Sequence, residues 1–262
     1  MSSDIVSSAL ACASTFSASA VASDDSSIAA SKFRAAYDAT RPCSKGTRLT
    51  FADAFAWAAA FTNEVQRLTS TSTNAPAMAL LRVRVATKDD AGTIMQFVRD
   101  LAEFEHAAES DVTTSTAILA ADGWGPEPAF HAYIVERPSP AGGASSSTAA
   151  FEPVAFALAH PIYSTWMGRS LYVEDLYVAP SARRQGVSML LFATLSRAAH
   201  AAGCARLQWS VLTWNEPAVQ AYEALGAERL EEWRLYRLYH DGIASLAGGA
   251  RRAVTSNSRL GQ

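Results

Sequence analysis

The segment Arg183–Ser188, with the sequence RRQGVS, holds residues whose types and spacing suit the binding of an anion. It lies between Leu171–Val178, a β-branched and aromatic run that predicts a strand, and Met189–Ala202, whose apolar residues recur at helical spacing. A short glycine-containing loop between a strand and a helix exposes several backbone N–H groups at the positive end of the helix. This arrangement predicts a site for a phosphate or pyrophosphate group.

Two carboxylates and one phenol are the other candidates for chemistry. Glu174 and Asp175 are neighbours on the predicted strand, so the alternation of side chains predicts that they face opposite sides of the sheet. Tyr222 lies five residues after Pro217 on a predicted helix, and its side chain is expected to point back toward the helix start. A tyrosine at such a position most often fills a core, so the spacing alone assigns it no chemistry.

A mixed sheet with helices is needed to position these residues. Leu81–Ala86 alternates apolar residues with arginine, which predicts a half-buried strand, and Thr87 with Asp90 predicts the N-cap of the next helix. The other predicted elements are, in chain order, a helix over Thr113–Ala121, strands over Phe130–Glu136, Pro153–Tyr163 and Leu171–Val178, a helix to about Ala202, a strand over Ala205–Leu212, a helix over Pro217–Leu225 and a closing strand over Trp233–Tyr239. The interleaving predicts an α/β fold on a mixed sheet.

The N-terminal part of the chain has a different composition. Of the first 30 residues 18 are alanine or serine, so residues 1–48 are expected to be mostly disordered. Residues 50–68 show apolar residues at helical spacing, which predicts a helix that docks either on its own fold, the favoured interpretation, or on a partner. We therefore expect an N-terminal extension over residues 1–78, one domain over residues 79–240, and a flexible tail over residues 241–262.

Composition and charge exclude several classes of protein. Residues 79–240 hold 13 basic and 18 acidic side chains, a net charge of −5 without a basic stripe, which argues against nucleic acid and favours a small cationic partner. Three cysteines (Cys12, Cys43 and Cys204) without a CxxC pair, and scattered histidines, predict neither a disulfide framework nor a metal site. With no apolar run that could span a membrane and no basic signal-peptide region, we expect a cytoplasmic protein.

The predicted element order, β-α-α-β-β-β-α-β-α-β, together with Arg183-x-x-Gly186-x-Ser188, resembles the GNAT acyltransferase fold. Further motifs resemble the diamine (spermidine/spermine) N-acetyltransferase family. They are the block Trp214–Gly226 (WNEPAVQAYEALG), the strand Tyr172–Val178 (YVEDLYV) with Trp166–Gly168 before it, the segment Leu101–Glu105 (LAEFE), and Trp233–Leu235. The resemblance covers roughly residues 81–240; the WNEP block is the specific part, and the glycine loop is less so.

The resemblance implies a central mixed, splayed β-sheet flanked by helices, with acetyl-CoA as co-substrate between the strands Leu171–Val178 and Ala205–Leu212. The N–H groups of Leu176 and Val178 would bind the pantetheine arm and the acetyl oxygen. The residues implied to contact CoA are Leu176, Tyr177, Val178, Arg183, Arg184, Gln185, Gly186, Val187, Ser188, Met189, Asn215, Glu216, Pro217 and Ala218. Ser188 departs from the glycine or alanine that is usual in the family.

The resemblance also implies a catalytic pair. Tyr222 would protonate the departing thiolate, and Glu174 would relay a proton from the substrate ammonium through water. Glu105 and Glu174 would form an acidic pocket for a small cationic amine. The residues implied to contact this substrate are Phe104, Glu105, Glu174, Asp175, Gln208, Trp209 and Ser210. Gln208 stands where some relatives carry a histidine proposed as the base, and Asn215 is expected to cap the helix that follows it.

These implications lead to one hypothesis, the transfer of an acetyl group from acetyl-CoA to a primary amine of a small di- or polyamine. Direct attack in a ternary complex is expected because no cysteine lies in the motif regions. Three alternatives stay open: the same chemistry on thialysine or another amino-acid-type amine, a CoA-binding regulatory or scaffold protein with weak catalysis, and a protein-lysine acetyltransferase. Family habit also predicts a homodimer, with Arg234 and the last strand at the interface.

Overall fold

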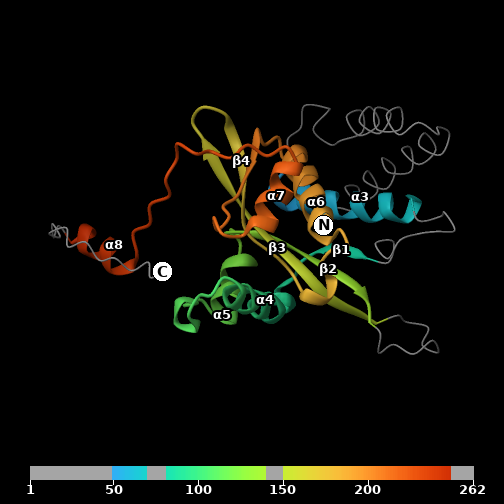
Figure 1. The fold of residues 1–262 in the computed structure, drawn as a ribbon, viewed down its shortest axis with the longest axis horizontal. Helices are drawn as coiled ribbons and strands as arrows, with labels where there is room; N and C mark the ends of the chain where they lie inside the picture. The colour runs from blue at the N-terminus through green and yellow to red at the C-terminus, as the bar shows by residue number, and fades with distance from the viewer. Residues whose placement is uncertain (1–48, 70–80, 140–149, 249–262) are drawn as a thin grey trace. The chain divides into compact units, whose positions relative to one another are not determined.

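A computed structural model describes residues 49–69, 81–139 and 150–248 of the chain. The chain forms two compact units, of which the first ends at Ser210 and the second begins at Val211. The first unit contains a five-stranded sheet in the order β1-β2-β3-β4-β5 (Figure 1). The strands are β1 (Arg82–Val85), β2 (His131–Pro138), β3 (Phe151–Ser164), β4 (Gly168–Val178) and β5 (Arg206–Gln208). Neighbours are antiparallel except β4 and β5, which are parallel, so the predicted mixed sheet is confirmed.

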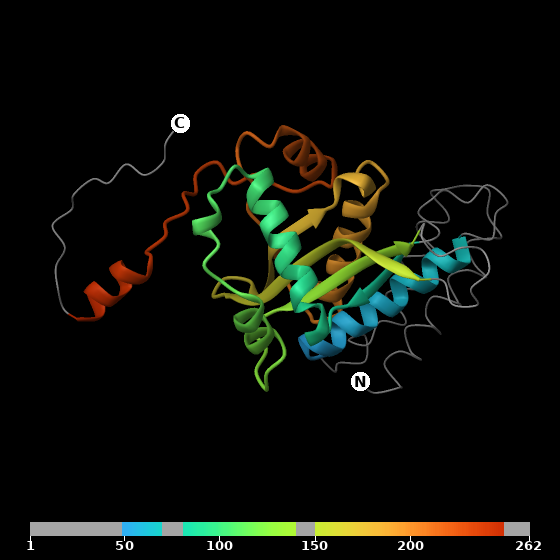
Figure 2. The same ribbon diagram turned by 90° about the horizontal axis from the view of Figure 1, so that it is seen from below.

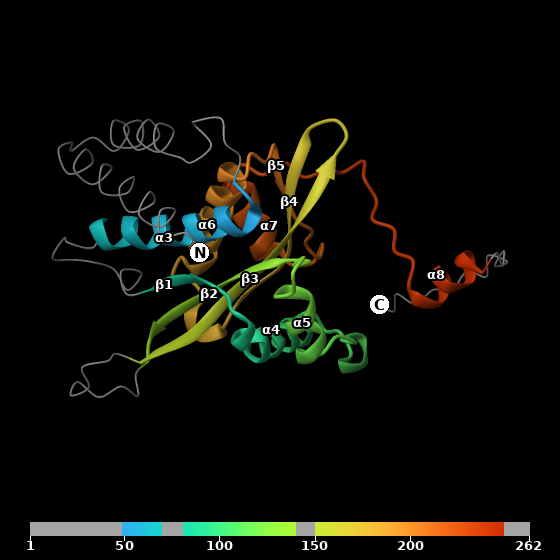
Figure 3. The ribbon, with the colours of Figure 1, turned by 180° about the vertical axis from the view of Figure 1, so that it is seen from behind.

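Helices cover both faces of this sheet. Helices α3 (Phe51–Thr69) and α6 (Val187–Ala201) lie on one face, and α4 (Ala91–Phe104) and α5 (Thr116–Gly123) lie on the other (Figure 3). Figure 2 shows α4 crossing the strands. Along β3 the small side chains of Ala155 and Ala157 belong to the core under α3 and α6, whereas Phe156 and Leu158 belong to the core under α4. The alternation of side chains along a strand thus feeds two separate cores.

Helix α3 is an integral part of the first unit. Thr50 caps its start, since the N–H of Asp53 donates to Thr50 Oγ1 at 3.1 Å. The ring of Phe55 stacks on Tyr133 of β2 with a centroid distance of 4.7 Å, and the Tyr133 hydroxyl donates to the carbonyl oxygen of Phe55 at 2.9 Å. The helix predicted near residues 50–68 therefore docks on its own fold, as expected. Among the described helices, none is long and apolar enough to cross a membrane.

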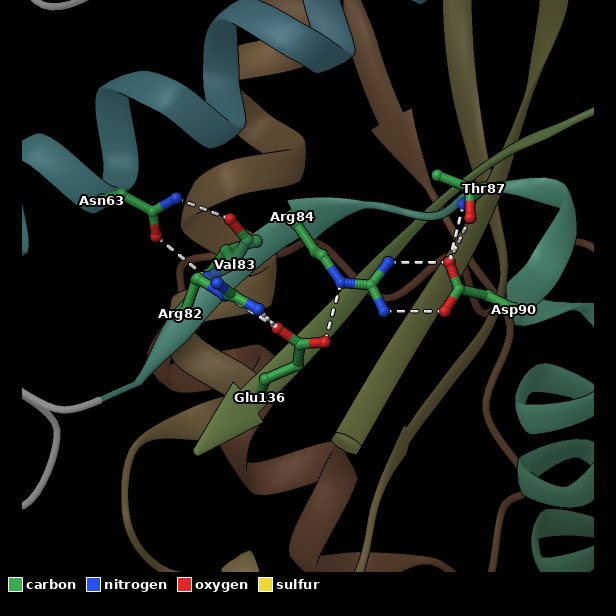
Figure 4. A network of polar contacts seen from close by, with 7 residues as sticks. All are labelled: Asn63, Arg82, Val83, Arg84, Thr87, Asp90 and Glu136. Carbon is green, nitrogen blue, oxygen red and sulfur yellow. Dashed lines mark hydrogen bonds and ion pairs between the residues drawn. The ribbon is translucent and has the colours of Figure 1, made fainter. Parts of the chain in front are cut away.

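The side chain of Asn63 in α3 closes the free edge of β1 (Figure 4). Its amide nitrogen donates to the carbonyl oxygen of Val83 at 2.6 Å, and its amide oxygen accepts from the N–H of Val83 at 2.9 Å. An edge strand presents unpaired backbone groups that another chain can pair with. The carboxamide satisfies one such pair of groups as a neighbouring strand would, so α3 both packs on the sheet and protects its edge.

A network of ion pairs joins β1 to β2 and to the start of α4 (Figure 4). Arg84 binds Asp90 with two hydrogen bonds of 2.7 Å and also donates to Glu136 at 2.8 Å. The N–H of Thr87 donates to the same Asp90 carboxylate at 2.7 Å. Burial opposes ionisation of Asp90, but the hydrogen bonds from Arg84 and Thr87 outweigh it and lower the pKa of Asp90. The predicted capping role of Thr87 and Asp90 is thus part of a larger network.

The second unit corrects the predicted C-terminal elements. It contains α7 (Glu216–Ala224) and α8 (His240–Ala247), the latter reaching into the tail that was expected to be flexible. The strand predicted over Trp233–Tyr239 is wrong, because within the described chain no strand pairs with this segment. Its apolar side chains are exposed, Trp233 by 68% and Tyr236 by 87%. The strand predicted over Ala205–Leu212 is real but is limited to β5.

The contact between Asn63 and β1 generates a test of stability. Asn63→Ala leaves the N–H and carbonyl groups of Val83 without partners, so the free energy of unfolding is expected to fall by about 1–3 kcal/mol. Urea unfolding followed by circular dichroism measures this change. The matched control is Gln96→Ala, because that exposed amide makes one hydrogen bond to Asp100 on the surface and is expected to change stability by about 0.5 kcal/mol or less. Equal effects of the two substitutions would contradict the edge-closing role of Asn63.

Candidate functional site

Strands β4 and β5 pair over only a short distance. Their ladder runs from the pair Ser170 and Arg206 to the pair Tyr172 and Gln208. Beyond it β4 continues to Val178 while β5 has ended, so among the strands that the structure describes only β3 pairs with the second half of β4. From Val173 to Val178, the edge of β4 that faces away from β3 is therefore not paired with β5, and we call this stretch the open edge.

The N–H groups of Leu176 and Val178 point toward this open edge. The N–H of Ala179 donates to the carbonyl oxygen of Val154 in β3 at 2.9 Å, and the register of this stretch is continuous. Because N–H groups alternate between the two sides of a strand, those of Val178 and Leu176 point away from β3. The carbonyl oxygen of Val178 points the same way, since it accepts from Arg183 Nε at 3.0 Å. The sequence-based expectation for these two groups is consistent with this direction.

The loop after β4 ends in a helix start that can hold an anion. Arg184 has φ of 62° and Gly186 has φ of 78°, a left-handed pair that turns the chain into α6. The first helical bond of α6 runs from the N–H of Leu190 to the carbonyl oxygen of Gly186, at 3.0 Å, so the first-turn N–H groups before it have no acceptor within the helix. Val187 is buried, whereas Ser188 and Met189 are exposed. This geometry fits a pyrophosphate group.

Arg183 and Gln185 are held against the protein. Besides its bond to Val178, the Arg183 guanidinium lies 5.2 Å from the ring centroid of Phe104 at the end of α4 and 5.9 Å from that of Tyr177. Gln185 Nε2 donates to the carbonyl oxygen of Ser181 at 3.0 Å. Arg183 thus ties the end of α4 to the end of β4 and fixes the entrance to the loop.

A β-bulge at Glu174 changes the direction of the carboxylates in β4. Ala159 of β3 pairs with Val173 and its neighbour Leu158 pairs with Asp175, so Glu174 has no partner in β3. Before the bulge Val173 packs under α3 and α6; after it Leu176 does. Asp175 shares the face of its partner Leu158, which belongs to the core under α4.

The bulge therefore brings both carboxylates to the α4 face. The expectation that Glu174 and Asp175 face opposite sides is wrong, because it assumed an uninterrupted alternation. Burial raises the pKa of Asp175 to about 6, and the charges of Glu174 and of Glu105, the C-cap residue of α4, contribute to the shift. Asp175 is half-buried and Glu174 and Glu105 are exposed. Three carboxylates thus lie close enough to repel one another, which suits a cationic ligand.

His160 and Tyr172 also belong to this group, and the sequence analysis did not find them. His160 Nε2 lies 3.4 Å from Glu174 Oε2, and the His160 ring lies 5.3 Å from the ring of Tyr172. The Tyr172 hydroxyl shares a hydrogen bond of 2.8 Å with Ser210 Oγ. The only signal in the sequence is a histidine within the otherwise apolar stretch of β3, before Pro161.

The remaining predicted substrate contacts lie at the end of β5 and of α4. Gln208 is the last residue of β5 and is half-buried. Trp209 packs on Phe192 of α6 with ring centroids 4.9 Å apart. Phe104 is the last residue of α4 and is 36% exposed. The expectation that these residues contact a substrate stays a prediction.

The second unit contains the other predicted residues. Asn215 occupies the N-cap position of α7, and Pro217 follows in the first turn between Glu216 and Ala218. The expected cap by the Asn215 side chain is wrong, because that side chain makes no capping hydrogen bond. The backbone carbonyl oxygen of Asn215 accepts from the N–H of Ala218 at 3.0 Å. Tyr222 lies in α7, where burial raises the pKa of its phenol.

Comparison with known proteins gives a consistent family. Residues 114–227 match the family described as "Acetyltransferase (GNAT) family". A thialysine N-epsilon-acetyltransferase of Mus musculus is 39% identical over 174 residues, which are 65% of this chain and 99% of that protein. A spermidine/spermine N(1)-acetyltransferase-like protein of Homo sapiens is 27% identical over 176 residues, which are 65% of this chain and 24% of that protein.

A solved structure shares the fold. An integron cassette protein from the mobile metagenome of V. cholerae aligns with a TM-score of 0.50 at 19% identity, covering 64% of this chain and 98% of that one. At this identity the likeness shows the fold alone.

The repulsion among the carboxylates generates a test of pH dependence. The carboxyl of Asp175 has a pKa of about 6 in the folded protein, above the value of about 3.9 in an unfolded chain. The folded state therefore loses stability as the pH rises through 6 and regains it as the pH falls toward 4. Asp175→Asn removes this penalty, so its Tm is expected to exceed that of the unsubstituted protein at pH 7.5 by about 2–4 °C per kcal/mol relieved.

Thermal unfolding by circular dichroism between pH 4 and pH 8 measures the effect. Asp122→Asn is the control, since that carboxylate is exposed. A Tm difference for Asp175→Asn that is the same at pH 4 and pH 7.5 would show that charge is not its cause.

Proposed function

Because the chain belongs to the GNAT family and is an N-acetyltransferase, we propose that it transfers an acetyl group from acetyl-CoA to a primary amine of a small di- or polyamine. The observation that carries this proposal is the group of carboxylates that the bulge in β4 gathers beside an open strand edge. The edge suits the acetyl donor, and the carboxylates suit a cationic acceptor.

The donor would bind along the open edge of β4 and at the start of α6. The N–H groups of Leu176 and Val178 would hold the pantetheine arm and the acetyl oxygen, since their direction leaves them facing the open edge. The first-turn N–H groups of α6 would hold the pyrophosphate. Ser188 can take part in this role as a smaller residue does, because its backbone N–H group is still available to the phosphate.

The acceptor would bind against Glu105, Glu174 and Asp175. Burial is the main cause of the raised pKa of Asp175, and a small amine with two or more ammonium groups would relieve the repulsion from Glu174 and Glu105 that adds to it. One ammonium group must lose a proton before its nitrogen can attack, and we assign the first transfer, through a water molecule, to Glu174. A second ammonium group would remain charged among the other carboxylates and fix the orientation.

The transfer would proceed by direct attack, with Tyr222 as the acid. The neutral nitrogen forms a bond to the thioester carbonyl carbon, the carbon–sulfur bond breaks, and the phenol of Tyr222 protonates the departing thiolate. The second proton that the nitrogen loses as it becomes an amide nitrogen then restores the Tyr222 phenol. A covalent acetyl-cysteine is disfavoured, because burial raises the pKa of Cys204 and keeps its thiol protonated. The family likeness of the block Trp214–Gly226 supports the role of Tyr222.

A second candidate acceptor is favoured by the names of the relatives. Several of them, from mouse, pig and cattle, are thialysine N-epsilon-acetyltransferases at 36–39% identity. Thialysine carries a carboxylate besides its amines, and an acidic group of side chains repels a carboxylate unless a cation accompanies it. The carboxylates of the site therefore favour the di- or polyamine, while sequence identity favours the amino acid.

A second copy of this chain is the partner that we propose for the exposed segment 230–239. Its exposed apolar residues are Leu230, Trp233, Leu235, Tyr236, Leu238 and Tyr239. Contiguous exposed apolar residues are typical of an interaction surface, and the family habit of dimerisation makes a homodimer the expected assembly. The mass of the protein in solution decides this: a monomer at micromolar concentration would contradict the dimer.

The cytoplasmic location and the absence of a metal stay predictions.

The first test of the function is a comparison of acceptors. Purified protein is assayed for release of CoA thiol with putrescine, spermidine, spermine, thialysine, lysine and a lysine-containing peptide. We expect the highest kcat/KM with a di- or polyamine. A clear preference for thialysine would select the second candidate, and a preference for the peptide would select protein-lysine acetylation. Binding of acetyl-CoA without transfer to any of these amines would contradict an enzymatic role.

The second test concerns Tyr222. Tyr222→Phe is expected to lower kcat by about 100-fold, in the range typical of general acid catalysis, while the KM for acetyl-CoA changes little. Tyr163→Phe is the control, because that phenol is 74% exposed in β3. A kcat unchanged in Tyr222→Phe, or a loss confined to acetyl-CoA affinity, would remove the phenol from the role of acid.

A further inference from the structure

His160 faces Glu174 in a geometry that suits the sharing of a proton. The two residues come from different strands, β3 and β4, and Nε2 of His160 lies 3.4 Å from Oε2 of Glu174. Nδ1 of the same ring lies 3.4 Å from the carbonyl oxygen of Pro161. A carbonyl oxygen can only accept a hydrogen bond, so it favours a proton on Nδ1 in either charge state of the ring, and the neutral ring therefore carries its proton there.

In that ring Nε2 presents a lone pair to the Glu174 carboxylate. Two acceptors then face each other, and a proton placed between them is attracted to both. The β-bulge creates this arrangement, because it leaves Glu174 without a partner in β3 and lets its side chain reach back to His160. The His160 side chain is 33% exposed, so a proton taken up there can leave to solvent.

We propose that His160 receives, through Glu174, the proton that the substrate amine loses. The inference rests on the proposed function of Glu174 as the first proton acceptor. The ammonium group passes one proton to a water molecule, the water passes one to the Glu174 carboxylate, and Glu174 passes one to Nε2. The net change is an ammonium and a neutral imidazole converted to a neutral amine and an imidazolium, which later releases its proton to solvent. Glu174 is thereby a carboxylate again before the next turnover.

The charged groups near His160 are carboxylates. Glu174 lies beside it, and Asp175 and Glu105 share the same side of the sheet and interact electrostatically with one another. Tyr172, which is opposite His160 in the ladder, contributes a neutral ring at 5.3 Å. Gln208 could not serve as the last proton acceptor in place of His160, because a carboxamide takes up no proton in this pH range.

The test compares two amines with the variants His160→Gln and Glu174→Gln. Spermidine is an ammonium ion at pH 7, whereas 2,2,2-trifluoroethylamine is largely neutral and needs no proton acceptor before attack. For His160→Gln, we expect kcat with spermidine at pH 7 to fall about tenfold or more, with trifluoroethylamine changing by about twofold or less. The spermidine deficit is expected to shrink as the pH rises toward the ionisation range of the amine itself. His240→Gln, a histidine that is 97% exposed in the second unit, is the control.

The outcomes separate the inference from the proposed function. Equal losses of kcat on both amines in His160→Gln would overturn the relay, because a structural role acts on both alike, and so would no loss on either. The proposed function would survive both results. Circular dichroism checks folding, and His160→Asn replaces His160→Gln if the latter is misfolded. If the unsubstituted protein acetylates no alkyl amine, the proposed function fails and the inference falls with it.

Discussion

The single extra residue in β4 is the constraint on which the candidate site depends. Were β4 paired regularly, Asp175 would point into the core under α3 and α6, where an unpaired carboxylate costs several kcal/mol, and Leu176 would point the other way. The bulge at Glu174 resets the alternation, so the aliphatic residues after it remain in the core and both carboxylates face α4. The irregular pairing at one residue thus allows several carboxylates to lie close together while both cores keep their apolar residues.

One strand therefore serves both substrates of the proposed reaction. In the first half of β4 the ladder with β5 completes the sheet, and in the second half its absence exposes backbone N–H groups. Arg183 keeps the end of this strand in place by bonding to the carbonyl oxygen of Val178. On the opposite border of the sheet the Asn63 side chain of α3 satisfies the backbone N–H and carbonyl groups of Val83 at the edge of β1.

Most elements of the fold were predictable, because their signals are local. Val83 alternates with arginines, Thr50 and Asp53 form a cap, and the helix and strands around Gly186 carry clear periodicity. The bulge was not predicted: two adjacent carboxylates between Val173 and Leu176 interrupt the alternation, but only the pairing with β3 shows that an extra residue is inserted there. The strand expected near Trp233 failed for a related reason: a strand exists only where a neighbour supplies hydrogen bonds. His160 was missed because its partner Glu174 lies on another strand.

The most direct test of the account is amide hydrogen exchange, resolved to single residues, with and without coenzyme A. The account predicts that CoA slows exchange at Leu176 and Val178 in β4 and at the first-turn amides of α6, Val187, Ser188 and Met189. These are the N–H groups that the open edge and the helix start leave available. Unchanged exchange at these five amides, with protection appearing elsewhere in the chain, would contradict the claim that the parting of β4 from β5 forms the donor site.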